Sequence, residues 1–304
     1  MAPRLHDPIS AHPETRHEAP SPRSHSHRVT VVVAALTASV LLAAPVAALR
    51  APLQAPVSAR KATPQADNIR GTMRADLIDA KAGDDIVDAR GGDDTVKGQV
   101  GNDTVYGGFG DDLLLLHAGN DVAYGGPDGD RALGGSGNDR LFGEESNDTL
   151  IGMSGNDFLD AGPGEDFLQG MDGDDIVLGG EGIDAVSAGV GNDRVEGGPG
   201  NDELDGGFGV DLLVDGDGDD EVTGDQDGDV HFIGPGADNV FGEQGDDLYY
   251  LLNDGVRDNI YCGDGYDQVI FVGTMDVSDN IGGSLAAFCE SIVVQPLPPE
   301  GWPY

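Results

Sequence analysis

An aspartate recurs every nine residues along most of this chain, and the register never breaks. When residues 71–250 are written in lines of nine, twenty lines follow without insertion or deletion, and the sixth place is always Asp. Ile, Val or Leu holds the eighth place in sixteen lines, and Gly holds the fourth place in sixteen. A register of this length predicts one small structural unit repeated along the chain.

The line at residues 134–142, Gly-Gly-Ser-Gly-Asn-Asp-Arg-Leu-Phe, serves as an example of the unit. Its three glycines lack a Cβ and permit the positive φ of a tight turn, so we expect a turn over the first six places. The last three residues are expected to form a minimal strand in which only Leu141 faces inward, because side chains alternate faces. Two lines then make one coil, and coils stack in parallel.

Stacking predicts a row of cation sites between the turns. Turns on the same side of neighbouring coils lie about 4.8 Å apart, so an aspartate of one turn lies near backbone carbonyls of the next. Carboxylate and carbonyl oxygens suit Ca²⁺, whereas Mg²⁺ demands stricter octahedral geometry. Calcium is therefore the favoured cofactor. The predicted metal ligands are Asp76, Asp85, Asp94, Asp103, Asp112, Asp121, Asp130, Asp139, Asp148, Asp157, Asp166, Asp175, Asp184, Asp193, Asp202, Asp211, Asp220, Asp229, Asp238 and Asp247.

This pattern resembles the RTX (repeats-in-toxin, hemolysin-type) calcium-binding nonapeptide repeat, and the resemblance covers 180 of 304 residues. It implies an all-β fold, a parallel β-roll (a β-helix solenoid) of about twenty nonapeptide half-turns. It also implies that the sixth-place aspartates are side-chain ligands and that the glycine-rich turns supply carbonyl ligands. A disordered Gly/Asp-rich tract is the alternative, but disorder does not require a regularly spaced aliphatic residue.

Charge indicates that the repeats depend on the cation. Residues 71–250 contain 44 acidic and 7 basic residues, a net charge of −37. Because such a coil repels itself, we expect it to be unfolded without calcium and folded with it. The net charge of the whole chain, −40, also argues against nucleic acid as a partner, since phosphate would be repelled.

The N-terminal segment that precedes the repeats predicts export from the cytoplasm. Residues 1–48 form an N-terminal region in which the uncharged apolar run Val29–Leu49 follows basic residues, as in a signal peptide cleaved after Val46-Ala47-Ala48. An uncleaved membrane anchor is the alternative, because an apolar run of this length can span a bilayer. Residues 49–66 read as a linker rich in Ala, Pro and basic residues. Both readings place the repeats outside the membrane.

The calcium-binding repeats are expected over residues 67–250 and a C-terminal cap over residues 251–304. The register slips after Tyr250, where Asp258 and Ile260 fall two places late. A cap is expected because an open strand edge invites association. The chain contains two cysteines, Cys262 and Cys289, and this even count in an exported protein favours a disulfide over two free thiols.

The repeats hold two histidines, His117 and His231. His231 falls at an eighth place, and we expect a partly exposed edge residue there rather than a metal ligand. The sequence contains neither a His-Glu-x-x-His zinc motif nor a Gly-x-Ser-x-Gly nucleophile motif, so we expect no enzyme activity.

The sequence therefore predicts a secreted calcium-binding repeat protein that folds on binding several Ca²⁺ ions outside the cell. A cell-surface adhesive or structural module, with a glycan or another surface molecule as partner, is an alternative. A diverged extracellular polysaccharide-active enzyme is the remaining one, because parallel β-helices host such enzymes.

Overall fold

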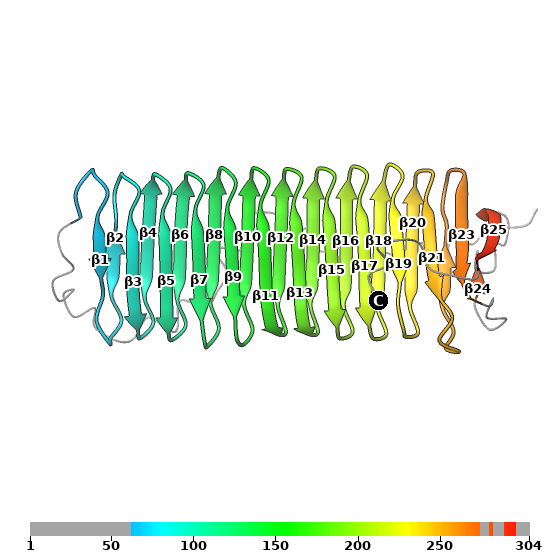
Figure 1. Ribbon diagram of the computed structural model, residues 1–304, viewed down its shortest axis with the longest axis horizontal. Coiled ribbons are helices and arrows are strands. Elements are labelled where there is room, and N and C mark those ends of the chain that lie inside the picture. The colour runs from blue at the N-terminus through cyan, green and yellow to red at the C-terminus, as the bar shows by residue number, and fades with distance from the viewer. Residues whose placement is uncertain (1–61, 274–279, 282–288, 296–304) are drawn as a thin grey trace, which may run out of the picture. The chain divides into compact units, whose positions relative to one another are not determined.

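The fold consists of two parallel β-sheets built by alternating strands. The computed structural model describes residues 62–273, 280–281 and 289–295. In this part of the chain the odd-numbered strands form a 13-stranded sheet and the even-numbered strands a 12-stranded sheet. The chain passes from one sheet to the other at every turn, so two strands complete one coil, and the coils follow one another in a row (Figure 1). The predicted all-β parallel β-roll is confirmed.

The strands of the first sheet are β1 (Asn68–Arg70), β3 (Ile86–Gly91), β5 (Thr104–Phe109), β7 (Val122–Gly126), β9 (Arg140–Glu144), β11 (Phe158–Gly164), β13 (Ile176–Gly182), β15 (Arg194–Pro199), β17 (Leu212–Asp217), β19 (Val230–Ile233), β21 (Leu248–Leu252), β23 (Asp267–Val272) and β25 (Cys289–Gln295). Those of the second are β2 (Leu77–Asp79), β4 (Thr95–Val100), β6 (Leu113–Ala118), β8 (Arg131–Ser136), β10 (Thr149–Ser154), β12 (Phe167–Asp172), β14 (Ala185–Val190), β16 (Glu203–Phe208), β18 (Glu221–Gln226), β20 (Asn239–Gln244), β22 (Asn259–Tyr261) and β24 (Asn280–Ile281). In the described ranges, no helix is long and apolar enough to cross a membrane. The predicted signal or anchor segment, Val29–Leu49, lies outside those ranges.

One coil is two nine-residue repeats, or nonads, long. Equivalent places of the repeat therefore stack on one another in successive coils. Leu141 pairs with Leu159, and Val87 pairs with Val105, in each case the same place of the nonad one coil further along the chain. The eighth-place side chains therefore form the core between the two sheets, and Leu141 is fully buried, as predicted. Burial of a Leu or Val contributes roughly 1.5–3 kcal/mol.

The strands are longer than the sequence predicts. Most of them span six residues, because the strand continues through the first place of the next nonad and pairing resumes at its second and third places, as between β8 and β10. The prediction of three-residue strands with one inward side chain was wrong. The first place also faces inward, as the fully buried Ala80, Leu116 and Ala161 show. The eighth and first places of the longer strands thus both face the interior, and the first place adds a side chain there where it is not glycine.

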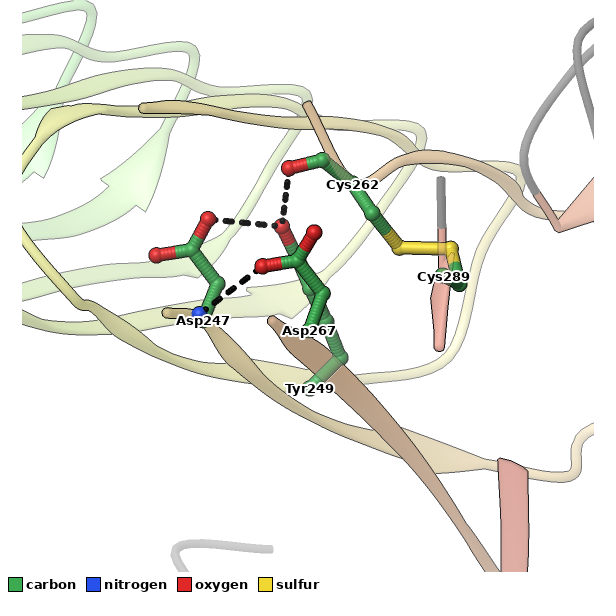
Figure 2. The surroundings of a disulfide bond; sticks show 5 residues. All are labelled: Asp247, Tyr249, Cys262, Asp267 and Cys289. Atoms are coloured by element: carbon green, nitrogen blue, oxygen red, sulfur yellow. Dashed lines mark hydrogen bonds between the residues drawn. A yellow bond between two sulfur atoms is a disulfide. The ribbon is translucent and has the colours of Figure 1, made fainter. Parts of the chain in front are cut away.

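The coil lengthens by two residues near its C-terminal end. Val240 pairs with Ile260 and Tyr249 pairs with Val269, a spacing two residues longer than in the coils before them. This is the predicted slip in register, and the strands after it, β22 to β25, still join the same two sheets. Cys262 and Cys289 form a disulfide with their Cα atoms 5.5 Å apart (Figure 2), so the predicted bond is confirmed.

Candidate metal-binding ladder

The sixth-place aspartates line up in two rows, one at each turn side of the coil. From Asp85 to Asp247, each Oδ1 accepts a hydrogen bond of 2.6–2.9 Å from the backbone N–H of the aspartate one coil earlier, as Asp139 does from Asp121. One row holds Asp85, Asp103, Asp121, Asp139, Asp157, Asp175, Asp193, Asp211, Asp229 and Asp247. The other holds Asp76, Asp94, Asp112, Asp130, Asp148, Asp166, Asp184, Asp202, Asp220 and Asp238.

The rows continue beyond the predicted set. Asp258 and Asp267 accept the backbone N–H of Asp238 and Asp247 at 3.2 and 3.0 Å. Both come after the two-residue slip, which removes them from the nine-residue frame but leaves them on the same edges of the roll. Counting from Ile260 and Val269, which occupy core positions, identifies these two aspartates from sequence.

The second carboxylate oxygen, Oδ2, accepts no hydrogen bond from the described residues in eighteen of the twenty predicted aspartates, and it is buried there. A buried carboxylate oxygen without a partner is costly, so these atoms indicate a ligand. The exceptions are Asp76 and Asp247. The Oδ2 of half-buried Asp76 accepts from the backbone N–H of Thr72 at 2.6 Å and from its hydroxyl at 2.9 Å.

The first glycine of the nonad leaves room beside this oxygen. A Cβ added to Gly134 would stand closer than a real Cβ does to Asp139 Oδ2, and 2.8 Å from the carbonyl oxygen of Gly152. We call this space, between a first-place glycine, the Oδ2 of the aspartate five residues later and the first-place carbonyl one coil on, a cradle. The carboxylate contact recurs at Gly98, Gly107, Gly125, Gly143, Gly152, Gly170, Gly179, Gly197, Gly206, Gly224 and Gly242.

The three glycines of the nonad have two different roles. Gly135 and Gly137 have φ angles of +117° and +120°, which favour glycine. Gly134 is absent from the positive-φ residues, so the prediction that all three glycines serve positive φ was wrong. Any side chain at this position would be excluded by the carboxylate of Asp139 and by the neighbouring coil. The first-place glycine therefore keeps the cradle open.

The donors in a cradle fit calcium. They are carboxylate and carbonyl oxygens, the ligands that Ca²⁺ takes in flexible geometry. The cradles are not uniform, because a side chain stands at the first place in several nonads. These first-place residues are Ala80, Ala89, Leu116, Ala161, Ala188, Asp215 and Ile233.

Burial makes the carboxylates reluctant to ionise without a cation. It raises the pKa of Asp139 to about 7 and that of Asp130 to about 8, and neighbouring aspartates of the same row add to the rise. The backbone N–H that each Oδ1 accepts lowers the pKa but does not cancel the effect of burial. Near neutral pH the rows need either protons or cations.

The densest group of carboxylates lies where the sequence is most acidic. Asp215 stands at a first place and is buried, and its Oδ1 accepts the N–H groups of Gly216 at 2.7 Å and Gly234 at 2.8 Å. Asp215, Asp220 and Asp238 each offer one ligand atom, and these atoms lie within 4.8 Å of one another. Burial, followed by the charge of Asp215, raises the pKa of Asp238 to about 9. Where other repeats have a first-place glycine beside the carboxylates of two coils, this position thus adds a third carboxylate, that of Asp215.

His231 lies in the core, so the prediction of a partly exposed edge residue was wrong. It is 0% exposed, and its ring stacks on that of Tyr249 with centroids 4.7 Å apart. Both residues hold eighth places in adjacent coils of one sheet, so their flat rings pack face to face in the space that aliphatic side chains fill elsewhere. Burial lowers the pKa of His231 to about 3, which keeps the imidazole neutral.

Tyr249 closes one cradle from inside. Its hydroxyl lies 3.3 Å from Asp247 Oδ2 and 3.3 Å from the carbonyl oxygen of Cys262, and Figure 2 shows it between these groups. A Cβ on Gly242 would collide with this hydroxyl. Asp247 Oδ2 therefore has a protein partner. In the aspartates of this row from Asp85 to Asp229, the same oxygen accepts no hydrogen bond from the described residues. This contact was not predicted from the sequence, although the aromatic residue at an eighth place indicates it.

Two rows of buried carboxylates beside oxygen-lined cradles define a parallel β-roll with metal-binding turns. The family model described as the RTX calcium-binding nonapeptide repeat (4 copies) matches residues 62–96, 70–104, 89–123, 124–159, 151–186, 178–213, 196–230 and 234–253. These segments cover more than half of the chain, which therefore belongs to this family and is a calcium-binding β-roll protein. Residues 231–233 fall between two matched segments. No curated protein matches the chain.

Proposed function

We propose that this is a secreted, non-enzymatic repeat protein that folds when it binds several Ca²⁺ ions outside the cell, with the sixth-place aspartates as ligands. The observation that carries the proposal is the set of eighteen buried Oδ2 atoms that accept no hydrogen bond within the described ranges. Calcium would supply the positive charge that these rows need, and the carbonyl oxygens in the cradles complete an all-oxygen donor set.

Different residues of one nonad have different roles in forming a site. Oδ1 of Asp139 accepts the N–H of Asp121 at 2.8 Å, which fixes the carboxylate between two coils. Gly134 leaves space beside the buried Oδ2, and the buried Leu141 holds the strand in the core. Because each carboxylate is held by the neighbouring coil, ion binding and coil stacking depend on each other.

Secretion explains how such a chain avoids folding too early. The calcium concentration of the cytosol is too low to order the repeats, so the chain would leave the cell unfolded and fold outside. The apolar run Val29–Leu49 supports this proposal as an export signal. Family membership supports it as well, since proteins with these repeats are typically secreted. N-terminal sequencing of the extracellular protein tests the export route, because a cleaved signal predicts a start near Leu49.

The test of coupled folding uses the purified full chain. Calcium is titrated into chelator-treated protein while circular dichroism and calorimetry are recorded on the same sample. We expect the strand signal to appear as several ions bind. A strand signal that persists in chelator at pH 8 contradicts the proposal, as does calcium binding without any change in that signal.

A surface feature favours a second role, adhesion to a glycan or another surface molecule. The ring of Tyr124 stacks between those of Tyr106 and Phe142, with centroids 5.0 and 4.9 Å apart. Tyr106 is 44% exposed, so this row offers apolar ring surface on the outside of the roll. Glycan-array binding in calcium, compared between wild type and Tyr124→Ser, tests this role. Equal binding by the two proteins excludes the aromatic row as the contact.

A further inference from the structure

One cradle contains a nitrogen donor in addition to oxygen. Asp229, His231 and Asp247 each offer one ligand atom, and these atoms lie within 4.8 Å of one another. A Cβ added to Gly224 would lie beside Asp229 Oδ2, 3.2 Å from His231 Nε2 and 3.2 Å from the carbonyl oxygen of Gly242. Three donor atoms, from β19, β20 and the turn before β19, thus lie around the Cβ position of Gly224, and Asp247 in the turn after β20 offers a fourth within 4.8 Å of the Asp229 and His231 ligand atoms.

Neither ring nitrogen of His231 forms a hydrogen bond with the described part of the chain. His231 is 0% exposed, and both Nδ1 and Nε2 are buried without a hydrogen-bond partner there. Burying a polar ring in this way is costly unless a ligand compensates for it. The Oδ2 atom of Asp229 is also buried and accepts no hydrogen bond from the residues that the structure describes. Donors of two kinds therefore face the same cradle without protein partners.

The donor set distinguishes this cradle from the others. Ca²⁺ takes oxygen ligands, whereas imidazole together with carboxylate suits Zn²⁺ and related transition-metal dications. We propose that the cradle of Gly224 binds a transition-metal dication, with Asp229, His231 and Asp247 as ligands and Zn²⁺ as the expected occupant. The site goes beyond the proposed calcium function and requires only that the roll be folded.

The surroundings orient the ligands. Asp247 Oδ1 accepts the N–H of Asp229 at 2.8 Å, and its Oδ2 lies 3.3 Å from the hydroxyl of Tyr249, whose ring stacks on His231. Hydrogen bonds of this kind fix ligating carboxylates in metal sites. The Tyr249 hydroxyl fills the next cradle of this row, that of Gly242, whereas the group that reaches the cradle of Gly224 is the imidazole nitrogen Nε2 of His231, which has no hydrogen-bond partner among the described residues.

The chain supplies a matched control histidine. His117 also lies in the repeats, but it is exposed, and its Nδ1 lies 2.9 Å from the carbonyl oxygen of Leu115. His117→Gln therefore removes a histidine without touching the cradle. His231→Leu places an aliphatic residue at an eighth place, as in Leu213 one coil earlier, so the variant keeps a core side chain.

The experiment counts metal ions on the full chain. Calcium-saturated wild type, His231→Leu and His117→Gln are equilibrated with Zn²⁺, freed of excess metal, and analysed for zinc and calcium by mass spectrometry. The histidines before the repeats contribute equally to all three proteins. We expect His231→Leu to carry one zinc ion fewer than the other two, with an unchanged calcium count. Equal zinc in all three proteins overturns the proposal.

Two further readouts complete the test. Nitrogen-15 spectra of the wild-type histidine rings should show a shift at His231 Nε2 on addition of Zn²⁺, which does not depend on any variant folding. No shift there, or loss of a calcium ion instead of a zinc ion in His231→Leu, also overturns the site. Circular dichroism of the same samples in calcium and chelator reports the proposed calcium function separately, so that the failure of one is not mistaken for failure of the other.

Discussion

Substitution of Gly134 by alanine isolates the role of the cradle, because alanine adds one carbon atom and nothing else. Gly134 is not among the positive-φ residues, so the backbone accepts a side chain. The added Cβ would collide with Asp139 Oδ2 and stand 2.8 Å from the carbonyl oxygen of Gly152. The carboxylate must therefore move, and its hydrogen bond from the N–H of Asp121, now 2.8 Å, is lost or weakened.

The expected cost follows from these contacts. Leaving the buried N–H of Asp121 without an acceptor costs about 1–3 kcal/mol. The stiffer unfolded chain with alanine offsets about 0.4–1 kcal/mol. Loss of one cation at about ten times its dissociation constant removes about 1.4 kcal/mol more. Gly134→Ala should therefore lower the free energy of unfolding in calcium by about 1.4–4 kcal/mol.

Urea unfolding in saturating calcium, followed by circular dichroism, measures this loss, and calorimetry counts the ions. Gly91→Ala is the control, because the three atoms nearest to its Cβ would be the Met73 Cε at 3.2 Å and two atoms of Phe109 at 3.5 Å, none of which is a carboxylate oxygen. We expect the control to stay within about 0.5 kcal/mol of wild type. If Gly134→Ala keeps the ion count and stability of wild type, the first-place glycine does not serve a cation.

Three further predictions concern the core, the acidic cluster and pH. Leu141→Ala removes a fully buried side chain and should lower the free energy of unfolding in calcium by about 2–5 kcal/mol, measured by urea unfolding, with an unchanged ion count. A lower ion count would show that the core and the cradle are not separable. Asp215→Asn retains an acceptor for the N–H groups of Gly216 and Gly234 but removes a negative charge beside Asp238. It should therefore weaken one calcium site, measured by calorimetry, and make the chain easier to fold in chelator. Tighter calcium binding refutes this assignment. In chelator, the raised pKa values of Asp130 and Asp238 mean that the folded chain binds more protons than the unfolded chain. Their stabilising effect is thus complete below about pH 4 and is lost as pH rises through about 8–9. The strand signal in chelator should be larger at pH 4.5 than at pH 8, and a signal that grows with pH contradicts the reasoning.

The sequence predicted the features that depend on spacing alone. A strict nine-residue frame and two strands per coil place Asp121 over Asp139 and Leu141 over Leu159, and the structure shows both alignments. The slip at Asp258 followed from the same count. These predictions needed no knowledge of side-chain contacts, because a solenoid repeats its geometry whenever the sequence repeats its length.

Features that depend on the neighbouring coil could not be predicted in the same way. Gly134 was interpreted through its own backbone, whereas its role is set by Asp139 and by Gly152, which belongs to the next coil. His231 was interpreted as a polar residue at an edge, whereas its burial depends on stacking against Tyr249. Both residues hold eighth places in adjacent coils, so the nine-residue register by itself predicts that their rings stack.

The inward positions explain how one backbone supports different chemistry along its length. A cation between two coils needs ligands from both, and near the C-terminal end of the roll inward side chains change the donors of these sites one by one. Asp215 adds a carboxylate, His231 an imidazole and Tyr249 a hydroxyl that reaches Asp247 Oδ2. The disulfide of Cys262 then ties the following coil to β25. In the last coils, the hydroxyl at Asp247 and the disulfide thus supply side-chain and covalent contacts between coils, where we propose that cations link the coils in the middle of the ladder.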